Sequence, residues 1–247
     1  MKPRYRRVVG LALLLAVVMF AGCANSLTTV KENFSQGVAN TSFSGEMLKT
    51  MEQAADDVRG HKDRYGDEGV SQASLMLAYA YVYSGKAAQG QLLAEDVKKD
   101  ADVAKLSAAT QALLTVVQAD ANYEEALDLA MVDVSGSFRL IRTYLESAAA
   151  AYHEAWDSEA LGSQANLRQL FALREADILI GGGNLLGVMN GEISRDFYTR
   201  AAEGAKLASA IDPALRKELL ERADRAQGYL RAPAGDANPA AGNTVQP

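Results

Sequence analysis

The sequence predicts an all-α protein built from antiparallel helical hairpins. Alanine is abundant, and only five prolines occur among the 247 residues. Runs of β-branched residues are rare, and no window alternates between apolar and polar residues for long enough to predict a strand. Apolar residues make up 49% of the chain, so it can bury a substantial core.

Apolar residues spaced three or four apart place the helices along the chain. The first is expected from about Ser44 to Val58, and a polar loop from Gly60 to Gly69 follows it. Gly85 is expected to end the second helix, and Asp212-Pro213 to begin the last. The predicted helices span residues 44–58, 71–84, 87–98, 103–119, 123–131, 138–156, 163–180, 194–211 and 213–230.

The N-terminus has the pattern of a secretory signal. Four basic residues precede a 13-residue apolar run from Val8 to Phe20. A membrane-spanning helix needs about 20 apolar residues, so this run is too short to span and suits a signal peptide. An uncleaved N-terminal anchor, and a plain signal peptide with an incidental cysteine, are the alternatives.

Three small residues follow the apolar run. Ala21, Gly22 and Cys23 resemble the lipobox of bacterial lipoproteins, although Phe20 stands where that family has an aliphatic residue. The resemblance implies cleavage before Cys23 and acyl chains on it. Cys23 is the only cysteine of the chain, so it cannot form an internal disulfide. The residue after Cys23 is Ala24 and not aspartate. By the same resemblance, this implies that the protein is located at the periplasmic face of the outer membrane.

The charge balance excludes one class of partner. Residues 1–22 hold four of the 25 Lys and Arg residues and none of the 31 Asp and Glu residues, so the remainder carries a formal charge of −10. Nucleic acid binding needs a basic face, so no nucleic acid partner is expected. Composition divides the chain into a signal peptide (1–22), a tether (23–42), a helical-repeat domain (43–231) and a disordered tail (232–247). The lipobox resemblance implies that the tether is lipidated at Cys23.

Two stretches resemble the tetratricopeptide repeat, a 34-residue pair of antiparallel helices. In the first, the leucine, small, tyrosine and glycine positions of the repeat are occupied by Leu77, Ala78, Tyr81, Gly85, Gly90 and Ala94. In the second, residues 122–127 resemble the turn and the opening of the second helix. Residues 201–213 resemble the end of a further repeat. The resemblance implies a tetratricopeptide-like α-solenoid; an unrelated α-bundle is the alternative.

The sequence shows no pattern typical of catalysis. His61 and His153 do not stand in a metal-ligand spacing, and no phosphate-binding glycine loop is present. We therefore expect no enzyme activity, no cofactor and no metal.

An apolar stretch from Ile178 to Met189 contains four glycines and has two interpretations. It is either a close helix–helix crossing or a smooth wall for a hydrophobic ligand. Aromatic residues at helical spacing would complete such a site, although the same spacing is typical of a core. The candidate ligand surface consists of Tyr79, Tyr83, Tyr152, Trp156, Leu185, Leu186 and Met189.

Three functional hypotheses follow. The first is a lipid-anchored helical-repeat adaptor in envelope transport or assembly, whose partner is an envelope protein such as a transporter or a periplasmic binding protein. In its lipobox, helical repeats and length, the chain resembles the T-component lipoproteins of TRAP transporters. The second is a carrier of a lipid, sterol or hopanoid-like ligand between the inner and outer membranes. The third is a purely structural lipoprotein. In each, the acyl chains on Cys23 contact the membrane.

Overall fold

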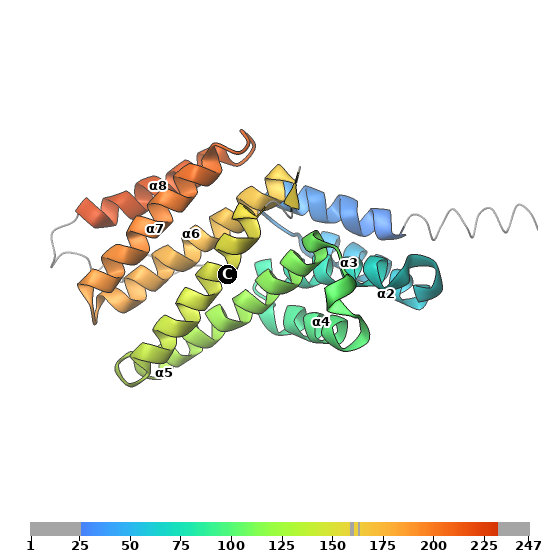
Figure 1. Ribbon diagram of the computed structural model, residues 1–247, viewed down its shortest axis with the longest axis horizontal. Coiled ribbons are helices and arrows are strands. Elements are labelled where there is room, and N and C mark those ends of the chain that lie inside the picture. The colour runs from blue at the N-terminus through green and yellow to red at the C-terminus, as the bar shows by residue number, and fades with distance from the viewer. Residues whose placement is uncertain (1–25, 159–160, 163, 232–247) are drawn as a thin grey trace, which may run out of the picture.

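The computed structural model describes residues 26–158, 161–162 and 164–231, and it confirms the all-α fold class (Figure 1). Within these residues there is no strand. A helix over residues 26–39 comes first. The later elements are α2 (Gly45–Gly60), α3 (Lys62–Tyr83), α4 (Ala87–Asp100), a short 3-10 turn η1 (Val103–Lys105), α5 (Ala108–Asp157), α6 (Ala165–Gly187), α7 (Gly191–Ser209) and α8 (Arg216–Arg231).

The described part of the predicted tether is a packed helix, so the domain begins before residue 43. Val30, Phe34 and Val38 are buried, and their spacing of four places them on one face of the helix over residues 26–39. The ring of Phe34 lies 6.0 Å from that of Tyr79 on α3. The predicted signal peptide, Cys23 and the predicted tail 232–247 lie outside the described residues.

Helices α3 and α4 form the antiparallel hairpin that the first repeat-like stretch predicts. Gly85 ends the hairpin's first helix with a φ of 75°, a conformation that favours glycine. A Cβ atom at Gly90 would come within 2.6 Å of the Ala78 carbonyl oxygen, so the missing side chain allows the two helices to approach closely. The predicted loop from Gly60 to Gly69 is wrong, because the chain is helical there apart from the turn at His61 and a break at Gly66.

Helix α5 contradicts the second repeat-like stretch. Residues 122–127 lie inside a continuous helical arm, where no glycine or proline interrupts the helix. The break in α5 falls at Asp133, in the predicted gap between residues 131 and 138, with φ −160° and ψ 96°. Its carboxylate accepts a hydrogen bond from the Gly136 backbone N–H at 3.0 Å. Residues 108–132 and 134–157 are therefore two arms of an antiparallel hairpin (Figure 1).

Helices α6, α7 and α8 pack in chain order, and α6 also contacts α5 and α8. The glycines that were expected to follow α6 continue it instead, to Gly187. A Cβ at Gly182 would lie 2.7 Å from the Phe197 ring, and one at Gly183 would lie 2.6 Å from the Tyr198 ring. This stretch is therefore a close crossing of α6 and α7. The last helix begins at Arg216, after a turn, and not at Pro213.

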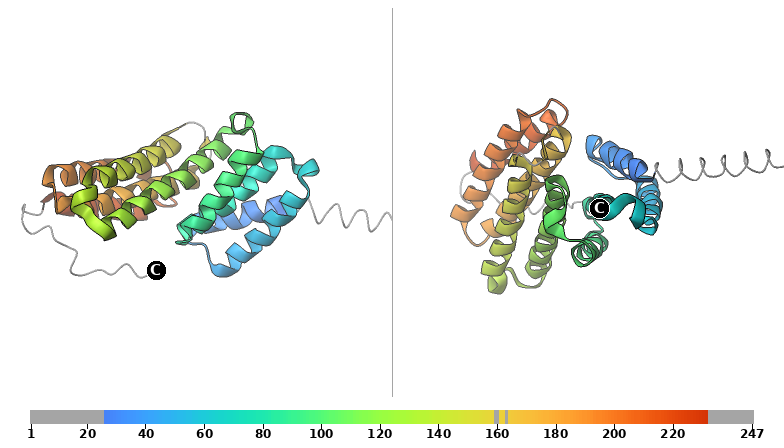
Figure 2. Two further views of the ribbon diagram at one scale, coloured as in Figure 1. Left: turned by 90° about the horizontal axis from the view of Figure 1, so that it is seen from below. Right: turned by 45° about the vertical axis from the view of Figure 1, so that its right-hand side comes forward.

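The molecule is elongated, and its two ends differ in the elements that they hold. The helix over residues 26–39 lies towards one end of the longest axis (Figure 1). The turn between the arms of α5 and the turn between α6 and α7 lie at the opposite end in Figure 1, and Figure 2 shows the same separation from below.

Candidate functional site

The seven residues of the predicted ligand surface divide into two groups that lie apart. The aromatic members pack around Phe171 of α6. The ring of Tyr79 lies 5.3 Å from that of Phe171, and the ring of Tyr152 lies 5.8 Å from it. Tyr83 contacts Tyr79 at 6.0 Å. These are core contacts, so the structure supports the packing interpretation of the aromatic spacing.

Trp156 belongs to the same core but makes a polar contact of its own. Its indole is buried, and its Nε1–H donates a hydrogen bond to the carboxylate of Glu175 on α6. The same carboxylate lies 3.2 Å from Nδ1 of His153, one turn earlier on α5. Burial raises the pKa of the Glu175 carboxyl, although Trp156 and His153 oppose this shift.

The aliphatic members lie towards the other end of α6. Leu186 is fully buried, Leu185 is half-buried, and Met189 is exposed in the turn before α7. None of the seven residues lines the clefts described below. The structure therefore corrects the prediction that they form one surface.

A buried ion pair joins α6 to both arms of α5. Both Nε and Nη2 of Arg174 contact Oδ1 of Asp120, at 2.9 Å and 2.8 Å. The Tyr152 hydroxyl donates to the other oxygen of this carboxylate, and the Arg174 guanidinium lies 5.1 Å from the centre of the Tyr123 ring. Asp120 is 1% exposed, and burial raises its pKa while Arg174 and Tyr152 act to lower it. The network satisfies both carboxylate oxygens, which is the arrangement of a structural tie.

The largest cleft described lies between α4 and the first arm of α5. It has a volume of about 690 Å³. Its polar lining residues include Gln91, Asn122, Glu124, Glu125, Asp128 and Tyr144. A smaller cleft of about 360 Å³ lies beside the helix over residues 26–39, where Phe34 and Val38 meet the start of α6. Carboxylates dominate the larger cleft, so its charge disfavours an anionic ligand.

Four exposed apolar side chains gather at the end of the molecule opposite the helix over residues 26–39, and we call this cluster the apolar tip. Met131 and Val132 are 78% and 87% exposed, at the end of the first arm of α5. Val188 and Met189 are 79% and 47% exposed, at the end of α6. The Ser135 hydroxyl lies 3.6 Å from the Met189 sulfur, so the two turns are in contact.

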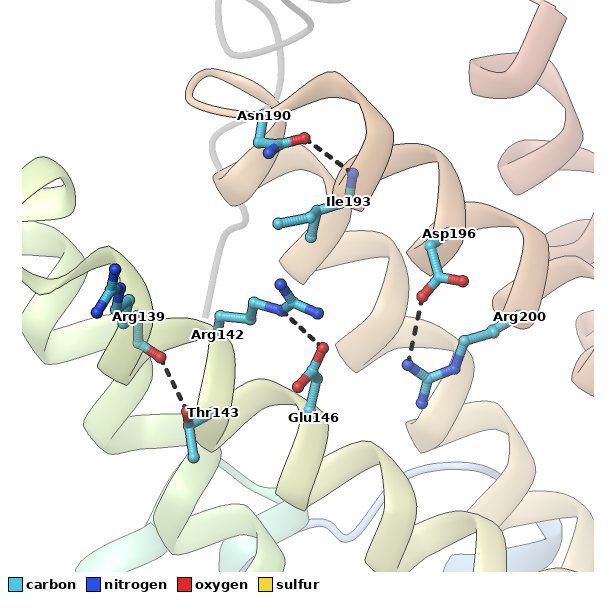
Figure 3. Close-up of polar contacts among 8 residues, drawn as sticks. All are labelled: Arg139, Arg142, Thr143, Glu146, Asn190, Ile193, Asp196 and Arg200. Carbon is cyan, nitrogen blue, oxygen red and sulfur yellow. Dashed lines mark hydrogen bonds and ion pairs between the residues drawn. The ribbon is translucent and has the colours of Figure 1, made fainter.

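The polar side chains near the tip are paired largely within their own helices (Figure 3). Arg142 binds Glu146 at 2.8 Å on the second arm of α5, and Arg200 lies 3.7 Å from Asp196 on α7. The Asn190 side chain caps α7 by accepting from the Ile193 N–H at 3.2 Å. The charges beside the tip are thus of both signs, and they do not form a basic surface.

Within the described residues, no group of three or more His, Cys, Asp or Glu side chains is arranged to hold a metal ion. In the same part of the chain, no helix combines the length and the apolar character that crossing a bilayer requires.

Sequence reasoning missed both the tip and the buried pair. Adjacent helical residues point to different faces, so the pair Met131-Val132 signals that at least one large apolar side chain is outside the core. Asp120 stands near the end of the otherwise largely apolar run from Leu113, which indicates a buried charge. Its partner Arg174 lies 54 residues away, and nothing in the sequence pattern links the two.

Comparisons of the chain with known protein families, with curated proteins and with solved structures give no match.

Proposed function

We propose that this protein is a lipid-anchored adaptor of the bacterial envelope that binds a protein partner through the apolar tip. The observation that carries the proposal is the exposure of Met131, Val132 and Val188, each more than three-quarters exposed, on two turns that touch. Large apolar side chains gathered on a surface mark binding sites more often than chance exposure does.

The position of the tip argues for a protein partner in preference to the anchoring bilayer. The described chain begins at residue 26, towards the far end of the longest axis from the tip (Figure 1). Lipid on Cys23 would place the bilayer beside that far end and direct the tip away from it. The charges near the tip are of both signs, which also disfavours an anionic lipid surface.

The anchor is tested by Cys23→Ser. The variant should remain as an uncleaved precursor or appear in the soluble periplasmic fraction, because the acyl acceptor is gone. Fractionation of cells, followed by mass spectrometry of the N-terminus, measures this. A Cys23→Ser protein that fractionates with membranes as the wild type does would show that lipidation is not the anchor.

Photo-crosslinking in intact cells tests the tip. The photoreactive amino acid p-benzoylphenylalanine is placed at position 132 and, as a matched control, at position 92. Leu92 is an apolar residue of α4 that is 68% exposed and lies outside the tip. We expect position 132 to give one discrete protein adduct that is lost when Met189→Asp is added, and position 92 to give none.

Equal adducts from both positions, or adducts from position 132 that persist in the Met189→Asp background, would contradict the proposal. An adduct to lipid alone at position 132 would contradict it as well, because the tip would then face a membrane.

A further inference from the structure

Glu175 is a buried acid whose carboxylate contacts no group of fixed positive charge. Only 6% of its side chain is exposed. The carboxylate of Asp120, the other deeply buried acid described above, contacts an arginine that is charged at every ordinary pH. Glu175 instead contacts a tryptophan N–H, which is neutral, and an imidazole, whose charge depends on pH.

The imidazole of His153 connects this buried carboxylate to solvent. Its Nδ1 lies 3.2 Å from one carboxylate oxygen and 3.3 Å from the other, while half of the side chain remains exposed. A proton can therefore reach the pair from water without any movement of the core. The pair lies where the second arm of α5 meets α6 and α7, and we call this junction the Glu175 seam.

Other charged groups at the seam do not replace the histidine. Arg200 of α7 acts on Glu175 only through longer-range attraction, and it lies beside Asp196. Arg168 of α6 is engaged with the Trp156 carbonyl oxygen at 2.7 Å. When His153 is neutral, Glu175 is thus a buried carboxylate without a close positive partner.

We propose that the Glu175–His153 pair takes up one proton on mild acidification and that this uptake tightens the seam between α5, α6 and α7. The proton either charges the imidazole, which creates an ion pair, or neutralises the carboxyl. Both outcomes remove the uncompensated buried charge, which is costly in an apolar surrounding.

The direction of the pH dependence follows from the pKa of the Glu175 carboxyl. Burial raises the pKa of Glu175 above the 4.5 of an ordinary glutamate. A group whose pKa is raised by folding stabilises the fold most below the unfolded value, and this contribution is lost as pH rises through the folded-state pKa. The seam should therefore tighten as pH falls from neutrality towards about 4.5.

Trp156 gives a direct readout, because it is the only tryptophan of the chain and donates to Glu175. Excitation of indole moves electron density away from its ring nitrogen, so a negative charge beside that nitrogen lowers the emission energy. In the full-length protein in detergent, acidification from pH 8 to pH 5 should shift the Trp156 emission to shorter wavelength in one transition. Glu175→Gln should abolish this shift to shorter wavelength, because no carboxylate then lies beside the indole nitrogen.

The two histidines provide a matched pair of variants. His153→Gln should move the transition to lower pH, because only the carboxyl then remains to titrate. His61→Gln should leave the transition unchanged, since His61 lies beside Asp57 on α2, outside the seam.

Emission that is independent of pH in the wild type would overturn the proposal. A shift to shorter wavelength that survives in Glu175→Gln, or one that His61→Gln removes, would also overturn it. If Glu175→Gln does not fold, an unchanged transition in His153→Gln is the result that rejects the proposal.

Discussion

The two arms of α5 are buried near the middle of their hairpin and exposed at its turn. Near the middle of the hairpin, the buried Asp120 and Tyr152 face each other and contact the largely buried Arg174. At the turn of the same hairpin, Met131 and Val132 are among the most exposed large apolar residues described. The difference shows that the same pair of helices stabilises the fold near its middle and presents an apolar surface at its turn.

The largest effect is expected at the buried level. Asp120→Ala should lower the free energy of unfolding by about 3–5 kcal/mol, because it leaves the largely buried Arg174 charge without its carboxylate partner. Urea denaturation followed by circular dichroism measures the loss. The control is Asp177→Ala, which breaks the more exposed pair between Asp177 and Arg222 at 3.0 Å. It should cost at most about 1 kcal/mol. Equal losses in the two variants would remove the distinction between buried and exposed pairs.

An intermediate effect is expected where α6 crosses α7. Gly182→Ala should lower the free energy of unfolding by about 1–3 kcal/mol, since the added Cβ would meet the Phe197 ring at 2.7 Å. Thermal denaturation measures it. Gly228→Ala is the matched control, because no atom lies within 4 Å of its added Cβ in α8. It should stabilise the protein by about 0.5–1 kcal/mol through helix propensity. An unchanged free energy of unfolding in Gly182→Ala would show that the Phe197 ring can move to accommodate the added methyl group.

The smallest effect on stability is expected at the tip, where binding should respond instead. Val132→Asp should change the free energy of unfolding by no more than about 0.5 kcal/mol, because the side chain is 87% exposed. With the photoreactive amino acid moved to position 188, the same substitution should reduce the partner adduct about tenfold or more, as for a central interface residue. A stable protein with an undiminished adduct would break the assignment of binding to the tip.

Local patterns predict much of this fold from the sequence. Helices α2 and α4 lie within two residues of their predicted ends, because apolar spacing defines both and Gly60 ends α2. The helix over residues 26–39 is not predicted, since its three buried apolar residues are diluted by polar neighbours that suggested a tether. The break in α5 at Asp133 falls in the predicted gap between residues 131 and 138, whereas the break predicted between residues 119 and 123 is absent, because no glycine or proline interrupts the helix there.

The sites are harder to predict than the helices. Tyr79 and Tyr152 have the spacing of a helix face, and that spacing cannot separate a core from a pocket. Only the packing of both rings against Phe171 decides between them. The Glu175 seam is missed for a different reason, since His153 and Glu175 are 22 residues apart on separate helices.

Gln169 gives the C-terminal helices a dependence that their order along the chain conceals. This fully buried amide of α6 donates to the backbone oxygens of Ala208 and Asp212, at 3.1 Å and 2.7 Å, and accepts from the Leu215 N–H at 3.1 Å. The end of α7 and the loop that follows it thus share three hydrogen bonds with a residue about 40 positions earlier. Removal of the chain from this loop onwards would leave the buried amide of Gln169 without part of its hydrogen bonding, so α8 is not a separable element.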